Sequence, residues 1–542
     1  MLDISGMACY NLFINFFHRK GERKLKHFKR IASVFLAAAI LFCCIPMSAS
    51  AADDLRTKDL REYPVIQMAG SISPLFYDDN GVDGETAFDF GWLASAFSQV
   101  DLMGPLQKLD LKGVVYALGE AIKIWFGNIQ MLPDGTSVNE ISRRGQWWCG
   151  NNWTEETVLN SYTPGQRIDV WYNFDWRGDP SLEADKLKDY IDLVKAKTGA
   201  EKVNLVAISG SGQIAMAYLA KYKQHYKDNL ASAVFNISLH NGNSAFGQLA
   251  LGEVRLDASA LGYTQLFAMM DMPDLQNQLA TTLKWLYESG VMDMVVNAFN
   301  LFSAVMKSEL YNKYLIPYLF TLPNMWNYVP MEYYEKAKKA LFADKPEYND
   351  FLLRSDWYHN QVMAKSGEIL QEAAETIKVA QWAGYNMPLM PFGKDTSVHS
   401  DSFVDTQYAS NGATCAELGC TFPFWYKQRE TCCGKNHISA DRMIDASTCA
   451  LPDQTWFSKN EYHQEERGYS GWFDWFLATP NPTVFTDVTK YPQFMEMVSL
   501  WNYQPVKAQE VTFLSVLKDI GYWLLKVWRF ILTLPMFWVR WV

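Results

Sequence analysis

The sequence predicts an α/β protein in which a mostly parallel central sheet has helices on both faces and is interrupted by a large helical insertion. Short apolar runs alternate with amphipathic helical segments along the first half of the chain, and no Pro/Gly/Ser-rich linker divides it. Strands that alternate with helices favour a parallel sheet, because each connection crosses back over a face. From residue 243 to about 385 long helical segments replace this alternation.

The expected elements follow in order along the chain. Before the insertion, apolar runs predict strands at residues 63–70, 167–174, 203–208 and 232–239, with a helix at 182–198. Within the insertion, helices are expected at 267–294 and 295–318, and sheet character returns at 387–392 and 455–459. We interpret the insertion as a cap over the substrate site, because it interrupts a regular progression. The predicted regions are a first core part at 52–242, the cap at 243–385, a second core part at 386–480 and a carboxyl-terminal extension at 481–542.

The first 51 residues have the organisation of a secretory signal peptide. Seven basic residues precede an apolar stretch at 31–47, and small residues follow at 48–52. Cleavage after Ala51 therefore predicts a secreted or cell-surface protein; an uncleaved membrane anchor is the alternative. Removing the seven basic and two acidic residues of this segment changes the net charge from −10 to −15. An acidic exported chain is not expected to bind nucleic acid.

Six cysteines remain after the predicted cleavage site. Five of them lie in a loop-rich excursion at 415–449, and the full set is Cys149, Cys415, Cys420, Cys432, Cys433 and Cys449. An even number in an exported chain favours disulfides, and fifteen pairings are possible. A zinc site at Cys432, Cys433, His437 and Cys449 is the competing interpretation, but the CxxC spacing typical of such sites is missing.

Residues 203–223 indicate a nucleophile elbow. A buried strand at 203–208 meets the small residues 209–212, and an amphipathic helix begins immediately afterwards. Such a strained turn needs small side chains two positions before and after the nucleophile, and Ala207 and Ser211 stand there around Ser209. Choosing Ser211 instead would place Gln213 in a crowded position. An ordinary Gly/Ser turn is the alternative.

These segments resemble the α/β-hydrolase superfamily, and within it the secreted bacterial lipases and lecithin:cholesterol acyltransferase-like lipases. The resemblance rests on PVIQMAGS at 64–71, YNFDWRGDP at 172–180, VNLVAISGSG at 203–212 and the run from 441 to 463. It covers the core from about 60 to 480, but not the cap or the last sixty residues. It implies an α/β-hydrolase fold and a triad in the chain order Ser, Asp, His.

A serine hydroxyl becomes a useful nucleophile when an imidazole takes its proton and a carboxylate orients that imidazole. Among the histidines downstream of Ser209, we choose His463, because it follows the late strand at 455–459, where this fold delivers its base. The other downstream histidines are His240, His359, His399 and His437.

The acid has two main candidates. Asp441 is favoured because its segment resembles the acid-to-histidine arrangement of secreted lipases, and Asp401, nearer the preceding strand, is the alternative. Arg442 and Ser402 replace the glycine that usually follows the acid. Asp445 and Asp405 are lesser options, and the losing carboxylates are expected to cap loops or to face calcium.

An oxyanion hole needs two backbone N–H donors. The resemblance implies Gly210, directly after the nucleophile, and Ser71, with Ile72 as the fallback for Ser71. Ala69 and Gly70 stand where the family commonly has His-Gly. This constellation requires no metal and no organic cofactor.

Residues 511–542 predict a wide apolar helix with a narrow polar stripe and aromatic residues beyond Pro535. Its lysines and arginine argue against a bilayer span and favour a helix lying at a membrane surface; docking on the protein is the alternative.

Taken together, the residues predict an exported serine hydrolase of carboxylic esters, with lipid or long-chain acyl substrates. Acyl transfer through the same triad is one alternative. An inactive cell-surface binding protein on a hydrolase fold is another, because Ala69, Ser211, Arg442 and Ser402 depart from the family pattern.

Overall fold

The structure, a computed structural model, describes residues 63–70, 74–79, 82–89, 92–101, 103–108, 110–142, 168–252, 309–389, 398–430, 434–461, 463, 470–499 and 502–508. The predicted signal peptide, the cap segment at 253–308 and the helix at 511–542 lie outside these residues, so the predictions made for them stay predictions. Within the described ranges, no helix combines the length and the apolar character that crossing a bilayer requires.

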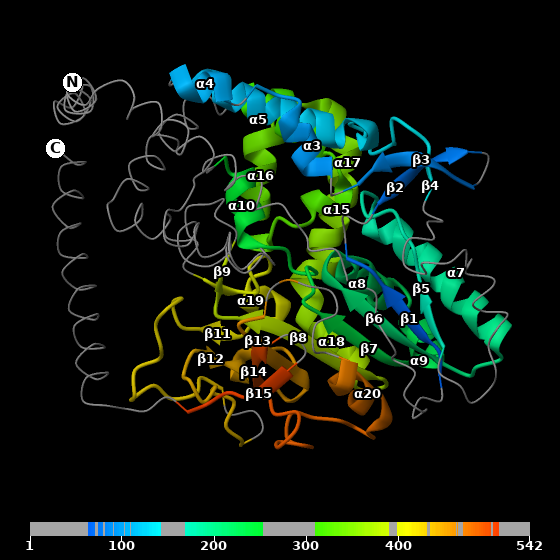
Figure 1. Ribbon diagram of the computed structural model, residues 1–542. Helices are drawn as coiled ribbons and strands as arrows, with labels where there is room; N and C mark the ends of the chain where they lie inside the picture. The colour runs from blue at the N-terminus through cyan, green and yellow to red at the C-terminus, as the bar shows by residue number, and fades with distance from the viewer. Residues whose placement is uncertain are drawn as a thin grey trace, which may run out of the picture.

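A mostly parallel eight-stranded sheet forms the centre of the protein, with the order β15-β14-β13-β8-β7-β6-β1-β5 (Figure 1). Its strands are β1 (Val65–Met68), β5 (Asp169–Trp171), β6 (Val203–Ile208), β7 (Leu230–Asn236), β8 (Lys378–Tyr385), β13 (Thr455–Lys459), β14 (Phe494–Ser499) and β15 (Asn502–Pro505). Neighbouring strands run parallel except β14 and β15. The expected α/β class and mostly parallel sheet are therefore confirmed.

Smaller sheets lie outside the central one. β3 (Val82–Phe88), β2 (Leu75–Asp79) and β4 (Ile141–Ser142) form a three-stranded sheet. Two antiparallel pairs join β9 (Met387–Pro388) to β10 (His399–Ser400), and β11 (Thr414–Cys415) to β12 (Ile444–Asp445). Both pairs follow β8 in the chain and belong to the loops beyond that strand.

Helices occupy the intervening segments. The α-helices are α3 (Leu93–Ser98), α4 (Met103–Lys108), α5 (Leu111–Phe126), α7 (Pro180–Thr198), α8 (Gly212–Lys221), α9 (Lys223–Asn229), α10 (Ser244–Ala250), α15 (Pro323–Trp326), α16 (Met331–Phe342), α17 (Asn349–Trp357), α18 (Ser366–Ala374), α19 (Thr406–Ala409) and α20 (Ser470–Ala478). Two π-helical segments span Tyr311–Phe320 and Tyr358–Val362. Single 3₁₀ turns span Gly127–Ile129, Ser209–Ser211, Pro346–Tyr348, Met363–Lys365, Ala446–Thr448 and Pro452–Gln454.

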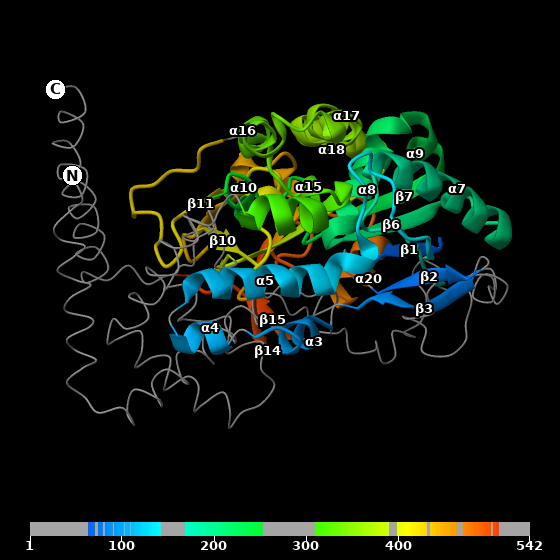
Figure 2. The same cartoon turned by 90° about the horizontal axis from the view of Figure 1, so that it is seen from above.

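Alternate residues of the sheet belong to two separate buried clusters. On β6, Leu205 and Ala207 join the cluster that contains side chains of α7, α8 and α18, whereas Val206 and Ile208 join the cluster built on α20. Successive side chains of a strand point to opposite faces, so helices cover both faces of the sheet. Figures 1 and 2 show α7, α8 and α9 grouped over the sheet and α20 lying apart from them.

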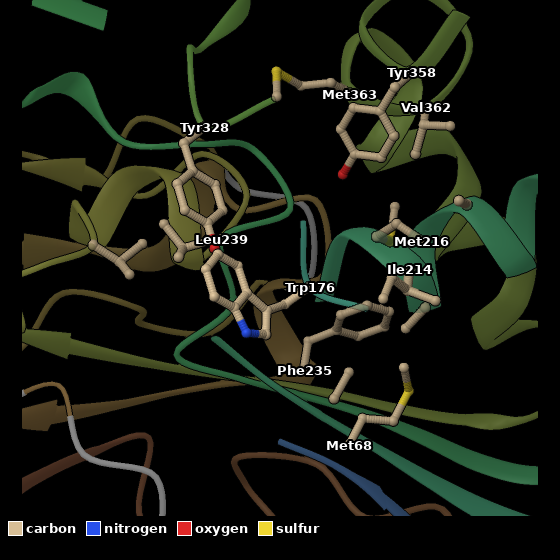
Figure 3. Packing of buried hydrophobic residues seen from close by; sticks show 14 of the residues in the cluster. Met68, Trp176, Ile214, Met216, Phe235, Leu239, Tyr328, Tyr358, Val362 and Met363 are labelled. Carbon is tan, nitrogen blue, oxygen red and sulfur yellow. The ribbon is translucent and has the colours of Figure 1, made fainter. Parts of the chain in front are cut away.

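The described part of the insertion packs directly on the core. Tyr328, Tyr358 and Met363 belong to the same buried cluster as Leu239 and Ile214, part of which Figure 3 shows. Two hydrogen bonds tie the later part of the insertion to the segment at 237–243, which follows β7. The Tyr358 hydroxyl donates to the carbonyl oxygen of His240 (2.9 Å), and the Asn243 N–H donates to that of Tyr328 (2.9 Å). The insertion therefore presses against the loop that follows β7.

Two expectations about the elements are wrong. The cap is predicted to extend to 385, but residues 378–385 form β8 in the middle of the sheet, and the sheet character predicted from 387 is present as the short strand β9. β8 is buried on both faces and lacks the alternation that separates a strand from a helix in sequence. In addition, β14 and β15 extend the sheet within the region interpreted as a carboxyl-terminal extension.

The strand order changes direction at β1, which has β5 on one side and β6 on the other. In an open parallel sheet, ligands bind outside the carboxyl ends of the strands, next to such a switch point. β6 and β1 are neighbours there, and β8 and β13 end at the same edge because they run parallel to β6. Residues that follow β6, β8 and β13 are therefore brought to one edge of the sheet.

Candidate active site

Ser209 stands on a sharp turn between β6 and α8. Its φ of 54° lies in the left-handed region, which side-chain-bearing residues rarely adopt, and the side chain is buried. Such strain is typical of functional sites and of nucleophile elbows in particular. Directly behind the turn, a Cβ on Gly212 would fall 1.8 Å from the Ser238 Oγ, so this position accepts only glycine unless Ser238 moves.

Ser211 supports the turn. Its Oγ accepts the N–H of Ile208 (2.8 Å) and donates toward the carbonyl oxygens of Ile208 (2.8 Å) and Met68 (3.0 Å). These bonds link the elbow to β6 and β1 and leave Ser211 fully buried. The small residue expected two positions after the nucleophile is thus used as a backbone clamp, which agrees with the choice of Ser209 over Ser211.

The structure brings Ser209 and His463 together across 254 residues of sequence. The Ser209 Oγ lies 2.8 Å from the His463 Nε2, and the His463 Nδ1 lies 2.8 Å from the Asp401 Oδ2. Asp401 is fully buried, and 17% of the His463 side chain is exposed. A carboxylate that accepts the Nδ1–H leaves the Nε2 lone pair facing the serine hydroxyl. In this tautomer the imidazole can take the proton of Ser209.

The carboxylate of Asp401 is held by its own loop. Its Oδ1 accepts the N–H groups of Phe403 (2.9 Å) and Val404 (2.7 Å), while Oδ2 faces the imidazole. This turn requires a φ of 83° at Ser402. It also lies against β8 at Gly384, where a Cβ would come within 2.6 Å of the Asp401 Cβ.

His463 follows β13 after a short turn. Asn460 has a φ of 62°, and its N–H donates to the carbonyl oxygen of Tyr385 at the end of β8 (3.0 Å). The backbone N–H of His463 then donates to the carbonyl oxygen of Asp401 (2.6 Å), and the Phe403 ring lies 5.0 Å from the imidazole. Backbone and side chain of His463 are both bonded to Asp401, so the two loops are held as one unit.

The favoured acid, Asp441, is not brought to His463. Its Oδ2 pairs with the Lys459 Nζ (3.0 Å) and accepts the Tyr385 hydroxyl (3.1 Å), and its Oδ1 accepts the Ser439 hydroxyl (2.7 Å). Asp441 therefore anchors the excursion to the ends of β8 and β13. The alternative, Asp401, occupies the position beside the imidazole, so the order of preference between the two was wrong.

The lesser acid candidates stabilise loops. Asp405 accepts the backbone N–H of Ser244 (2.9 Å) and its hydroxyl, which connects the acid loop to the start of α10. Burial raises the pKa of Asp405 to about 6. Asp445 accepts the N–H and hydroxyl of Ser447 and the hydroxyl of Tyr426. Both fit the loop-capping role expected for the carboxylates that are not part of the triad.

The remaining downstream histidines are fully buried in other surroundings. Burial lowers the pKa of His240 to about 3 and that of His359 and His399 to about 4. Each has a local partner: His240 contacts Ser238, His359 bonds to Ser355 and Val329, and His399 accepts the Asn386 N–H. His437 lies between Gln493 and Asp453. These four histidines are therefore bonded to groups in their own surroundings and not to Ser209.

One of the two expected oxyanion donors can be placed. Gly210 directly follows Ser209 in the buried turn at the start of α8. Ser71 and its fallback Ile72 lie outside the described residues, three and four positions after the end of β1. β1 is the direct neighbour of β6, so the segment after β1 begins beside the elbow.

The expected cysteine chemistry falls largely outside the described residues, which contain neither Cys149 nor Cys432 and Cys433. Cys415 and Cys449 are thiols and do not form a disulfide in the described part of the chain. Burial raises the pKa of Cys415 to about 12 and also raises that of Cys449. In that same part of the chain, no three His, Cys, Asp or Glu side chains are grouped as metal ligands would be.

Comparison of the chain with known protein-family models and with curated proteins finds no match.

Proposed function

We propose that this protein is an exported serine hydrolase of carboxylic esters, similar to the lipases of the α/β-hydrolase superfamily. The proposal rests on one observation above all: a hydroxyl, an imidazole and a buried carboxylate lie in line at 2.8 Å each, at the carboxyl edge of a parallel sheet. These distances are within hydrogen-bond reach, which general-base activation of a serine requires.

Two further features support the hydrolase assignment. The nucleophile has a positive φ between a buried strand and a helix, and the three residues follow in the chain order Ser, Asp, His. Both features are typical of α/β-hydrolases. Asp401 replaces Asp441 in the proposed triad, and Gly210 and Ser71 remain the proposed oxyanion donors.

The proposed reaction has two halves. In the first, the Ser209 Oγ bonds to the ester carbonyl carbon while its proton passes to the His463 Nε2, and the carbonyl oxygen becomes an oxyanion. The C–O bond to the alcohol then breaks, and the alcohol leaves with the proton from Nε2. In the second half, water attacks the acyl-enzyme, gives its proton to Nε2, and releases the carboxylic acid as Ser209 recovers its proton. Asp401 stabilises the imidazolium in both halves.

Long-chain or lipidic acyl groups remain the proposed substrates. The described part of the insertion is rich in buried aromatic side chains, among them Trp326, Tyr328 and Tyr358, and it packs on the loop that follows the nucleophile's neighbouring strand. These side chains belong to the buried core, and what supports an apolar substrate is the aromatic-rich composition of the segment that packs beside the loop after β7. Acyl transfer to an alcohol uses the same steps with an alcohol in place of water.

The experiment is covalent labelling with a fluorophosphonate, followed by hydrolysis of p-nitrophenyl esters of increasing acyl length. The wild-type protein is expected to label and to hydrolyse, and Ser209→Ala is expected to do neither. Ser181→Ala, in the first turn of α7, is the matched control and should behave as wild type, because its hydroxyl is bonded to Lys221 and not to Ser209 or His463. A folded wild-type protein that does not label would refute the proposal and support the binding-protein alternative.

A further inference from the structure

Glu461 carries a buried carboxyl group two residues before His463. Only 3% of it is exposed. Its Oε2 accepts the Trp382 Nε1–H (3.0 Å) and its Oε1 accepts the Tyr503 hydroxyl (2.6 Å). Both donors are neutral, and burial raises the pKa of Glu461 to about 7. Burying an ionisable group among apolar rings costs free energy, so a carboxyl group at this position is expected to have a structural or catalytic role.

The two donors connect two strands, β8 and β15, to the turn that follows β13. Trp382 lies in β8, Tyr503 in β15, and Glu461 follows the last residue of β13 by two positions. Trp382 is packed against Trp472 of α20, with ring centroids 5.0 Å apart. The carboxyl group is thereby bonded to side chains that the core itself holds in place.

The turn that ends in His463 has fixed points on both sides of Glu461. On one side the Asn460 amide bonds to Asn386 (2.7 Å) and to Glu496 (3.0 Å). On the other side the His463 N–H bonds to the carbonyl oxygen of Asp401. Gly384 of β8 lies beneath, and a Cβ there would come 3.4 Å from the carbonyl oxygen of Glu461. The carboxyl group of Glu461 lies between these points and adds a further attachment of the turn to the sheet.

We infer that Glu461 is a positioning residue, which holds the turn after β13 against the sheet and thereby sets the place of the His463 imidazole between Ser209 and Asp401. The expected change in kcat rests on the proposed function, whereas the expected change in the position of the turn does not. A side chain that cannot accept hydrogen bonds from Trp382 and Tyr503 removes these two attachments of the turn to β8 and β15.

Three variants test this role. Glu461→Leu removes both hydrogen bonds. Glu461→Gln keeps them, because the amide oxygen can accept from Trp382 while the amide N–H₂ donates to the Tyr503 hydroxyl oxygen. The control is Gln493→Leu, which removes another buried polar side chain. The Gln493 side chain is hydrogen-bonded to Pro452, Thr455 and His437 near the start of β13. Gln493 therefore stabilises the start of β13, whereas Glu461 lies just beyond the end of the same strand.

The readouts are kcat and KM for a short-chain p-nitrophenyl ester, measured below the unfolding temperature of every variant. Because a displacement of about 1 Å can cost on the order of 100-fold in rate, kcat of Glu461→Leu is expected to fall by about that factor while KM stays unchanged. Glu461→Gln should restore most of kcat, and Gln493→Leu should keep it. Equal losses in the two leucine variants, or no loss in Glu461→Leu, would overturn the inference.

Amide hydrogen exchange gives a readout that needs no activity. The His463 N–H should exchange faster in Glu461→Leu and not in Gln493→Leu, because only the first change frees the turn. If the wild-type protein neither labels nor hydrolyses esters, the proposed function fails, and this exchange comparison still decides the positioning role. Unchanged exchange at His463 in Glu461→Leu would refute that role even in an active enzyme.

Discussion

Replacing Asp401 by asparagine is expected to abolish most of the proposed esterase activity without unfolding the protein. The Oδ1 of Asp401 accepts two backbone N–H groups, from Phe403 and Val404, and asparagine can keep those bonds only with its carbonyl oxygen. Its N–H₂ group must then face the His463 Nδ1, which would have to act as an acceptor. The proton moves to Nε2, and the imidazole can no longer take the proton of Ser209.

The magnitude follows from this change of tautomer. In the well-studied serine protease triad the same substitution lowers kcat by about 10⁴. A similar arrangement here predicts a loss of about 5.5 kcal/mol in transition-state stabilisation. KM should change little, because Asp401 is buried behind the imidazole and does not face the substrate.

Asp441→Asn is the matched variant, since the same chemical change is made at the carboxylate that the sequence analysis favours. It weakens the ion pair with Lys459 and is expected to cost about 1–3 kcal/mol of unfolding free energy. It should leave kcat near the wild-type value, because Asp441 contacts neither Ser209 nor His463.

The assay is the steady-state hydrolysis of p-nitrophenyl butyrate by both variants, with circular dichroism to establish that each is folded. The reasoning would be refuted by the opposite pattern, in which Asp441→Asn is inactive and Asp401→Asn retains kcat. A parallel loss in both variants would show that the two acid-bearing loops act together.

Three further predictions concern stability. Burial raises the pKa of Glu461 from 4.5 to about 7, so the folded state binds this proton more tightly than the unfolded state does. The free energy of unfolding should therefore fall by about 3 kcal/mol as the pH rises from 4.5 to 7. Urea titrations at pH 5 and pH 8 measure this difference, and it should be smaller in Glu461→Gln. Gly384→Ala would push a methyl group against Asp401, so thermal unfolding should show a loss of about 1–3 kcal/mol together with a lower kcat; a wild-type kcat would contradict the close approach. Arg177→Ala removes the buried ion pair between Arg177 and Asp175 and should cost about 3–5 kcal/mol in denaturant titration, with fluorophosphonate labelling of the folded fraction unchanged.

The choice between Asp401 and Asp441 shows where local sequence stops being informative. Both aspartates precede a residue with positive φ, 83° at Ser402 and 59° at Arg442, and both accept nearby backbone N–H groups. Their turns are alike, so no local pattern separates them. What separates them is the residue on the neighbouring strand: Gly384 lets the first loop lie close to β8, while Lys459 captures the second carboxylate.

The location of β8 could not be read from the sequence for a related reason. A strand buried on both faces has no polar alternation, and only three residues separate β8 from α18. The elbow, in contrast, was visible in sequence, because a strand, a turn of small residues and a helix are all local features. β6 and β13 have the bounds that their apolar runs predicted.

The α/β class, the sharp turn at Ser209 and the order in which the serine, the candidate acids and the histidine occur all follow from the amino-acid sequence, because they depend on local periodicity and turn chemistry. The tertiary structure alone decided which carboxylate meets His463, and it revealed the buried Glu461 beneath the histidine turn. Both depend on contacts between residues that lie 62 and 79 positions apart in the chain. Such contacts are set by sheet order and close packing, which leave no mark at the residues concerned until the chain is folded.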